Sequence, residues 1–352
     1  MNRFMAFALC AALCWACKET PKEPSLAETL KTYTIEQMMD NETIRGGSFS
    51  PDKSKLLVTS NQSGVYNMYT IPVSGGEPTP VTASDSSSIR AISYFPKDGR
   101  MLFSMDDNGN EIYQIYLRDT SGTVTNLTPG EGARSVFYRW GKDDHSFFYG
   151  SNKRDNRFMD LYEMDTESYT PKIIYQNDGG YNLNAISDDK QYLALSKSIN
   201  TNDSDLFLYD LGDGSMTKVN QNQSANSAED FSPDGKQLYY TTDDGVEFAY
   251  LMEYDIAEKT HKKAMERNWD IMGSYFTENG TYQVTYVNED AKNVIEVRDT
   301  KTNAPVELPS FENMDITSVL FSDDEQWMRF YACGSHTPSN LFIYNLATKE
   351  QK

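Results

Sequence analysis

The sequence predicts an all-β fold, a seven-bladed β-propeller with four antiparallel strands in each blade. A turn followed by a strand, clearest in FSPDGKQLYY from Phe231, occurs seven times at intervals of 45 or 46 residues. A second apolar strand follows each copy, and no long helical pattern interrupts the series. A period near 45 residues with strand-type apolar runs is typical of propeller blades.

Each copy of the repeat starts with an aromatic or apolar residue. These residues are Phe49, Phe95, Trp140, Ile186, Phe231, Phe276 and Phe321. In the fifth copy Pro233 presets φ, Asp234 bonds back to its own backbone, and Gly235 supplies a positive φ. The residues after the turn, such as Leu and Tyr, suit a half-buried strand.

The first blade sets the order of elements for the other six. Thr34 and Gln37 fit a capping box, which predicts a short helix over residues 35–39 ahead of the blade. The predicted strands of blade one are Ile44–Phe49, Lys55–Thr59, Tyr66–Val73 and Thr79–Thr82.

The seventh blade is predicted to be incomplete. Its first three strands are Thr317–Phe321, Gln326–Ala332 and Asn340–Leu346. The chain reaches Lys352 where the spacing in other blades places the start of the fourth strand. Either a segment near Leu30–Ile35 supplies the missing strand, or more protein follows. We expect the second, because an unpaired strand edge invites aggregation.

The N-terminus resembles a bacterial lipoprotein signal. Arg3 is followed by 13 apolar residues, Phe4 to Ala16, which is too short a run to span a bilayer. We predict a signal peptide over residues 1–17 with cleavage before a lipidated Cys17, a tether with the short helix over residues 18–42, and the propeller over residues 43–352. An ordinary secretory signal is the alternative. The protein is expected on the periplasmic or cell-surface face of a bacterial membrane, anchored by lipid alone.

Charge and composition exclude several classes of function. The net charge is −20, from 32 basic and 52 acidic residues, which argues against a nucleic-acid partner. After loss of the signal and lipidation, only Cys333 remains, so no intramolecular disulfide is expected. No Gly-x-Ser-x-Gly elbow occurs, and the three histidines show no metal-ligand spacing. We therefore expect no catalytic residue, metal or cofactor in this chain.

Several strings resemble the N-terminal propeller of the prolyl oligopeptidase family of serine peptidases, with the dipeptidyl and acylaminoacyl peptidase-like members most similar. They are GSFSPD from Gly47, SNQSGVYN from Ser60, VSGGEP from Val73, YGSNKRD from Tyr149, DLY from Asp160 and TPSNLF from Thr337. The resemblance covers residues 33–352. The SPDG turns themselves are shared with TolB-type propellers.

The resemblance implies a propeller that caps an α/β-hydrolase domain and admits peptides to it. No residue of this chain matches the catalytic Ser-Asp-His triad of that family, so the hydrolase domain is expected to lie outside it. Arg154, Asp155 and Arg157 are candidates for contact with a peptide substrate, and a structural ion-pair role is the alternative for them. The competing function is a stand-alone TolB-like protein-binding propeller tethered through Cys17.

Overall fold

The computed structural model describes residues 32–352, which fall into two units with a boundary between Glu42 and Thr43. The described part of the first unit holds one short helix, α3 (Ile35–Met39). The predicted capping box is present, because the Thr34 side chain accepts from the Gln37 N–H and the Gln37 side chain accepts from the Thr34 N–H. The predicted signal peptide, Cys17 and Leu30 lie outside the described residues.

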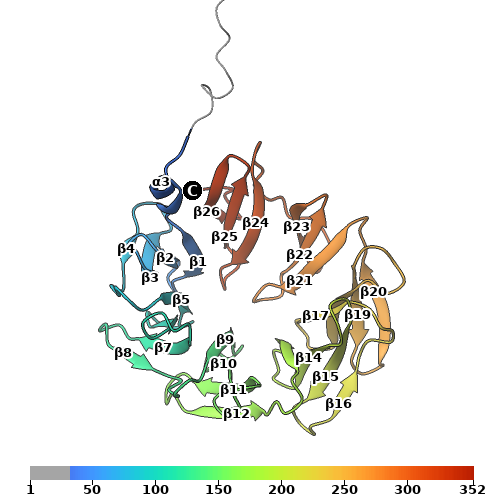
Figure 1. The fold of residues 1–352 in the computed structure, drawn as a ribbon. Coiled ribbons are helices and arrows are strands. Elements are labelled where there is room, and N and C mark those ends of the chain that lie inside the picture. Colours follow the sequence, from blue (N-terminus) through green and yellow to red (C-terminus); the bar gives the residue numbers. More distant parts are fainter. Residues whose placement is uncertain (1–31) are drawn as a thin grey trace, which may run out of the picture. The chain divides into compact units, whose positions relative to one another are not determined.

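The second unit is a ring of seven antiparallel sheets, and its strands follow the chain around the ring from blue to red in Figure 1. Blade one consists of β1 (Ile44–Phe49), β2 (Lys55–Ser60), β3 (Asn67–Pro72) and β4 (Thr79–Pro80). Blade two consists of β5 (Ile89–Tyr94), β6 (Met101–Met105), β7 (Gln114–Arg118) and β8 (Val124–Asn126). Blade three consists of β9 (Ser135–Trp140), β10 (Ser146–Ser151), β11 (Asp160–Asp165) and β12 (Pro171–Tyr175).

The remaining blades continue in the same order. Blade four consists of β13 (Asn182–Ile186), β14 (Tyr192–Ser198), β15 (Ser204–Asp210) and β16 (Met216–Lys218). Blade five consists of β17 (Asn226–Phe231), β18 (Gln237–Thr242), β19 (Tyr250–Asp255) and β20 (Thr260–Met265). Blade six consists of β21 (Asp270–Phe276), β22 (Tyr282–Glu289) and β23 (Lys292–Asp299). Blade seven consists of β24 (Asp315–Phe321), β25 (Trp327–Gly334) and β26 (Thr337–Asn345).

The propeller prediction is confirmed, and the last two blades depart from four full strands. In blade six the fourth strand is reduced to a bridge between Arg298 and Pro305. In blade seven Tyr344 bridges to Gln351, and the backbones of Ile343 and Lys352 exchange two hydrogen bonds of 2.9 Å. A fourth strand therefore begins on β26 where the repeat spacing predicted it. The described residues 32–35 form no strand.

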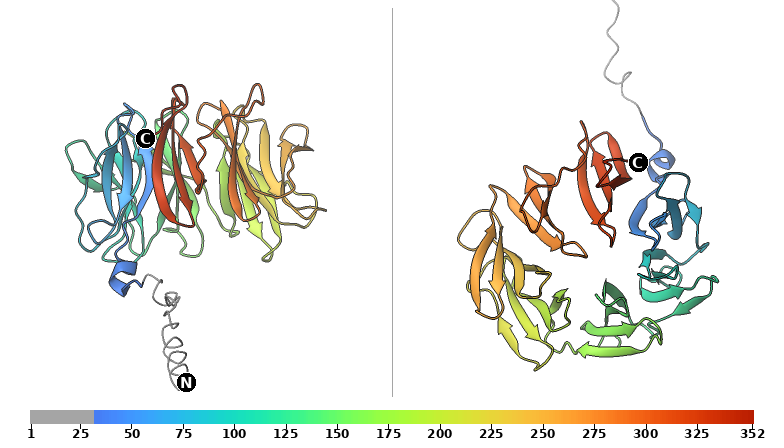
Figure 2. Two further views of the ribbon diagram at one scale, coloured as in Figure 1. Left: turned by 90° about the horizontal axis from the view of Figure 1, so that it is seen from above. Right: turned by 180° about the vertical axis from the view of Figure 1, so that it is seen from behind.

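The first strand of every blade lines the centre of the ring, as both face-on views show (Figures 1 and 2). We call the end where each first strand turns into the second the turn end, and the opposite end the loop end. Each first strand contains one extra residue relative to its partner, a β-bulge that increases local twist. The bulged residues are Gly47, Ile92, Tyr138, Asn184, Glu229, Met272 and Thr317.

The core lies between neighbouring blades rather than inside any one of them. The residues that start the repeats are buried there. Phe95, for example, is 1% exposed, and its ring centroid lies 4.9 Å from that of Trp140 in the next blade. Similar clusters join the other blade pairs. Broad apolar side chains at a fixed period thus fill each gap between twisted sheets, which is why the repeat is readable in the sequence.

Blades seven and one close the ring through side chains. Ile343 of β26 packs in the same cluster as Phe49 of β1. The Tyr331 hydroxyl donates to the Gly46 carbonyl at 3.2 Å, and Lys53 forms an ion pair with Asp323. The seam therefore resembles the other blade junctions in kind, although it joins the two ends of the repeat array.

Candidate functional site

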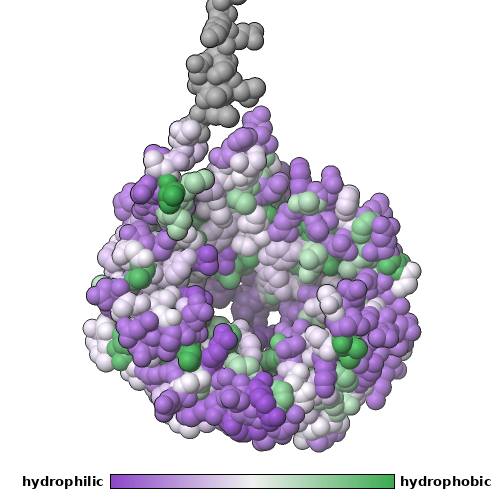
Figure 3. Space-filling model, in the orientation of Figure 1, coloured by the Kyte–Doolittle hydropathy of each residue, from purple (hydrophilic) through white to green (hydrophobic). Residues whose placement is uncertain are grey.

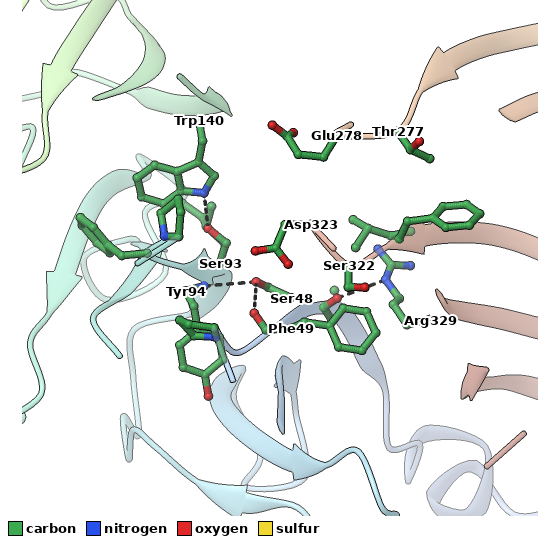
Figure 4. Close-up of a pocket in the computed structure, with 18 of the residues that line it drawn as sticks. Ser48, Phe49, Ser93, Tyr94, Trp140, Thr277, Glu278, Ser322, Asp323 and Arg329 are labelled. Carbon is green, nitrogen blue, oxygen red and sulfur yellow. Dashed lines mark hydrogen bonds between the residues drawn. The ribbon is translucent and has the colours of Figure 1, made fainter. Parts of the chain in front are cut away.

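A pocket of about 420 Å³ lies at the turn end of the central channel. Five blades contribute to it, the first three and the last two. Its main lining side chains are Ser48, Phe49, Ser93, Tyr94, Phe95, Phe137, Trp140, Asp144, Tyr275, Phe276, Thr277, Glu278, Leu320, Phe321, Asp323 and Arg329. Figure 4 shows these groups converging from opposite sides of the opening.

One wall of the pocket is aromatic. Trp140 at the end of β9 packs against Phe95 and Phe137, and its indole N–H donates to the Ser93 hydroxyl at 2.8 Å. This hydrogen bond fixes the ring orientation because the indole has a single donor. The wall offers a broad apolar surface, and its one polar group, the indole N–H, already has a hydrogen-bond partner. Pockets for small molecules are commonly lined by such aromatic surfaces.

An ion pair crosses the channel at the same end. Lys142, in the β9–β10 turn of blade three, has its ammonium 2.9 Å from the Glu278 carboxylate in the β21–β22 turn of blade six, and it also donates to the Glu278 carbonyl. Blades three and six are not neighbours in the ring, since blades four and five lie between them on the shorter side. We call this Lys142–Glu278 pair the crossbar.

A smaller cavity of about 180 Å³ also adjoins Glu278. Its polar lining includes Arg139, Asp188, Asp230 and Glu278. Arg139 donates to Asp188 at 2.6 Å. The Asp230 carboxylate accepts from the Phe276 N–H at 2.9 Å, and burial raises its pKa to about 6. Glu278 lines both cavities, so the crossbar stands at their boundary.

The crossbar residues share one position in the repeat. Lys142 and Glu278 each follow the residue that starts a repeat by two places. The seven residues at this position are Pro51, Lys97, Lys142, Asp188, Pro233, Glu278 and Asp323. We call them the turn ring. Five of its seven members are charged, and Lys97 also pairs with a neighbouring blade, through Asp144 at 3.9 Å.

The turn ring was missed at the sequence level although a signal was present. Proline is the residue that suits this turn position, as in the first and fifth copies, and the other five copies replace it with charge. The turn does not require these charges, because this turn position accepts most residues. Which of the charges meet across the channel depends on the curvature of the ring, which the repeat does not encode.

The three residues predicted to contact substrate lie elsewhere, in the loop between β10 and β11 at the loop end. Arg154 binds the buried Asp160 carboxylate with two hydrogen bonds of 2.7 and 2.8 Å, and this interaction raises its pKa. Arg157 pairs with Asp155 at 2.7 Å and is 71% exposed, and the pairing lowers the pKa of Asp155. None of the three lines the pocket.

The described part of the chain offers no ready metal chemistry. Within residues 32–352, no cluster of three or more His, Cys, Asp or Glu side chains is arranged to hold an ion. No helix within these residues has the length and apolar character needed to cross a membrane. What the site provides is an apolar wall, a charged ring and one partly buried arginine, Arg329, which are features suited to binding.

Comparisons with known proteins place these features in context. The family model described as "Prolyl oligopeptidase, N-terminal beta-propeller domain" matches residues 81–352. The chain is 24% identical over 296 residues to dipeptidyl aminopeptidase BIII of Pseudoxanthomonas mexicana, covering 80% of this chain and 42% of that protein.

Two solved structures share the fold. A puromycin-hydrolyzing peptidase of Mycobacterium tuberculosis superposes with a TM-score of 0.67 at 10% identity, over 89% of this chain and 52% of that one. TolB of Acinetobacter baumannii superposes with a TM-score of 0.52 at 15% identity, over 96% of this chain and 85% of that one. The chain thus spans about half the length or less of the two peptidases that it matches.

Proposed function

This chain belongs to the family of prolyl oligopeptidase N-terminal β-propeller domains, and we propose that it is the non-catalytic part of an exported serine peptidase. In this proposal the propeller admits peptides to a hydrolase domain and keeps folded proteins out. Peptides are the substrates that would pass the channel, and the catalytic residues belong to the hydrolase domain.

The observation that carries the proposal is the crossbar. Two side chains from non-adjacent blades meet over a channel whose innermost strands expose apolar residues, among them Val136, Met272 and Leu320. Figure 3 shows the opening at the centre of the ring, seen in the direction of Figure 1. An extended peptide could displace the pair, whereas a folded domain is wider than the gap that two side chains bridge.

The energetics of the crossbar suit a gate. The Lys142 and Glu278 side chains are 36% and 49% exposed, and such pairs contribute only about 0–1 kcal/mol. Thermal motion and an incoming ligand can therefore break the pair without disturbing the blades. Neighbouring blades, by contrast, are joined by buried apolar clusters. These contacts stay intact when the crossbar breaks.

Export and anchoring are part of the same proposal and rest on the sequence of residues 1–17. Lipid attached at Cys17 would hold the propeller at a membrane face outside the cytoplasm. Incorporation of a radioactive fatty acid by cells that express the chain, and its loss in Cys17→Ser but not in Cys14→Ser, tests this part.

The test of the function uses the complete gene product. We expect it to hydrolyse short chromogenic peptides but not a folded protein that contains the same cleavable sequences. We also expect it to lose activity after treatment with diisopropyl fluorophosphate. A product that hydrolyses no peptide, or that ignores the serine reagent, would overturn the peptidase assignment.

One observation favours a second function. The superposition on TolB spans 96% of this chain and 85% of the TolB chain, so the fold also fits a protein of nearly this length. The alternative is a stand-alone protein-binding propeller held at a membrane through Cys17. An inactive gene product that recovers a defined protein partner from an envelope extract, with saturable binding, would support it.

A further inference from the structure

Arg329 occupies the seam between the last and first blades, at the inner wall of the turn-end pocket (Figure 4). It belongs to β25, and its Nε–H donates across the seam to the Gly47 carbonyl of β1 at 3.3 Å. One terminal nitrogen also donates to the Ser318 hydroxyl at 3.4 Å. Both bonds are long, and both acceptors are neutral.

The backbone leaves room for this side chain. Gly47 has φ +113°, and a Cβ atom there would lie 3.2 Å from Cδ of Arg329. A side chain at this position would therefore meet the arginine stem, in a backbone conformation that favours glycine in any case. The glycine thus lets the guanidinium lie against β1 and reach the pocket.

The charge of Arg329 has no counter-ion within the described chain. No carboxylate of residues 32–352 lies within 4.0 Å of its guanidinium. Burial lowers its pKa below the ordinary arginine value. Four of the five other arginines in partly buried positions are paired with carboxylates, namely Arg100, Arg139, Arg267 and Arg298, and Arg118 is the exception.

The free donors of Arg329 face the pocket and not a sealed interior. A guanidinium has five N–H groups, and two of them are used here. Arg329 is one of the residues that line the pocket, and none of its nitrogens is fully buried without a partner, since Ser88 Oγ is the one such side-chain atom in the described residues. The carboxylate of Asp323 at the mouth is committed to Lys53.

We propose that Arg329 binds the C-terminal carboxylate of a peptide whose last side chain is apolar and packs on the aromatic wall at Phe137 and Trp140. A guanidinium with free N–H groups matches a carboxylate in geometry and charge. The pocket volume of about 420 Å³ suits one or two residues. A bound peptide would lie with its C-terminus at the turn end and its N-terminus along the channel.

This inference goes beyond the proposed function, because it concerns binding by the propeller alone. It is tested by isothermal titration of the full chain with N-acetyl-alanyl-phenylalanine and with the same peptide as its C-terminal amide. We expect the acid to bind at least tenfold more tightly than the amide, the difference that one charge-assisted contact of about 1.4 kcal/mol gives. Equal binding of the two, or no binding of either, would overturn the proposal, whatever the peptidase assay shows.

Variants locate the effect. Arg329→Gln should abolish the preference for the acid, whereas Arg90→Gln, which removes an exposed arginine on the first strand of blade two, should keep it. Circular dichroism and thermal unfolding establish that each variant is folded. If Arg329→Gln does not fold, Ser318→Ala serves instead and should reduce the preference by loosening the guanidinium.

A third probe separates a peptide terminus from other apolar acids. Octanoate has a carboxylate and an apolar chain but no amide groups. We expect it to bind more weakly than the peptide acid and to compete with it. Octanoate that binds while the peptide acid does not would contradict the assignment to peptides.

Discussion

Replacement of Asp230 by asparagine should stabilise the propeller at neutral pH and lose that advantage in acid. Asp230 lines the smaller cavity beside Glu278, and burial raises its pKa from 3.8 to about 6. A carboxylate with a raised pKa binds its proton more tightly in the folded state, so its ionisation opposes folding as pH rises through the window from 3.8 to about 6. A rise of that size costs about 3 kcal/mol at pH 7.

Asparagine avoids this cost at every pH, although it places an amide where a carboxylate oxygen now accepts from the Phe276 N–H at 2.9 Å. That lost hydrogen bond costs about 1 kcal/mol independently of pH. The net gain at pH 7 is therefore about 2 kcal/mol, and roughly half of the ionisation cost disappears by pH 5.

The assay is urea unfolding of the wild type and Asp230→Asn at pH 7 and pH 5. Asp234→Asn is the contrast, because hydrogen bonding from Ser232 lowers the pKa of Asp234 and the sign is reversed. A difference in unfolding free energy between Asp230→Asn and wild type that does not shrink from pH 7 to pH 5 would refute the reasoning.

Other substitutions follow from the same structure. Gly47→Ala should destabilise the propeller by about 1–3 kcal/mol through backbone strain, and by a further amount because the added Cβ contacts the Arg329 stem. Gly46→Ala should show the strain alone, because no atom lies within 4 Å of its added Cβ. Urea unfolding measures both effects. Asp160→Ala removes a buried carboxylate that holds Arg154 and should cost about 3 kcal/mol. Arg157→Ala at the surface should leave the urea midpoint unchanged.

Much of the propeller could be predicted from the sequence because its period is enforced by packing. The side chains of Phe95, Phe231 and Phe321 are buried between blades, so their spacing must match the size of a blade. The bulges escaped prediction, since their positions carry residues as different as Gly47 and Glu229.

The site was less accessible to sequence reasoning, for a physical reason. Apart from Arg329 on β25, its residues come from turns and first strands of five blades, and their meeting depends on how the ring closes. Lys142 and Glu278 are 136 positions apart and have no local relation. Arg154, Asp155 and Arg157 were chosen by resemblance. Arg154 pairs with Asp160 and Asp178, and Arg157 pairs with Asp155.

The measurement that tests the gating account most directly joins the crossbar covalently. In the complete gene product, cysteines at Lys142 and Glu278 are linked by a short bis-maleimide in a Cys333→Ser background, and hydrolysis of a ten-residue peptide is compared before and after linkage. The matched control links Lys97 and Asp144, which pair at the same rim between neighbouring blades. If the crossbar gates the channel, hydrolysis falls at least tenfold when it is linked and changes little in the control. Unchanged hydrolysis with the crossbar linked would show that peptides reach the hydrolase by another route.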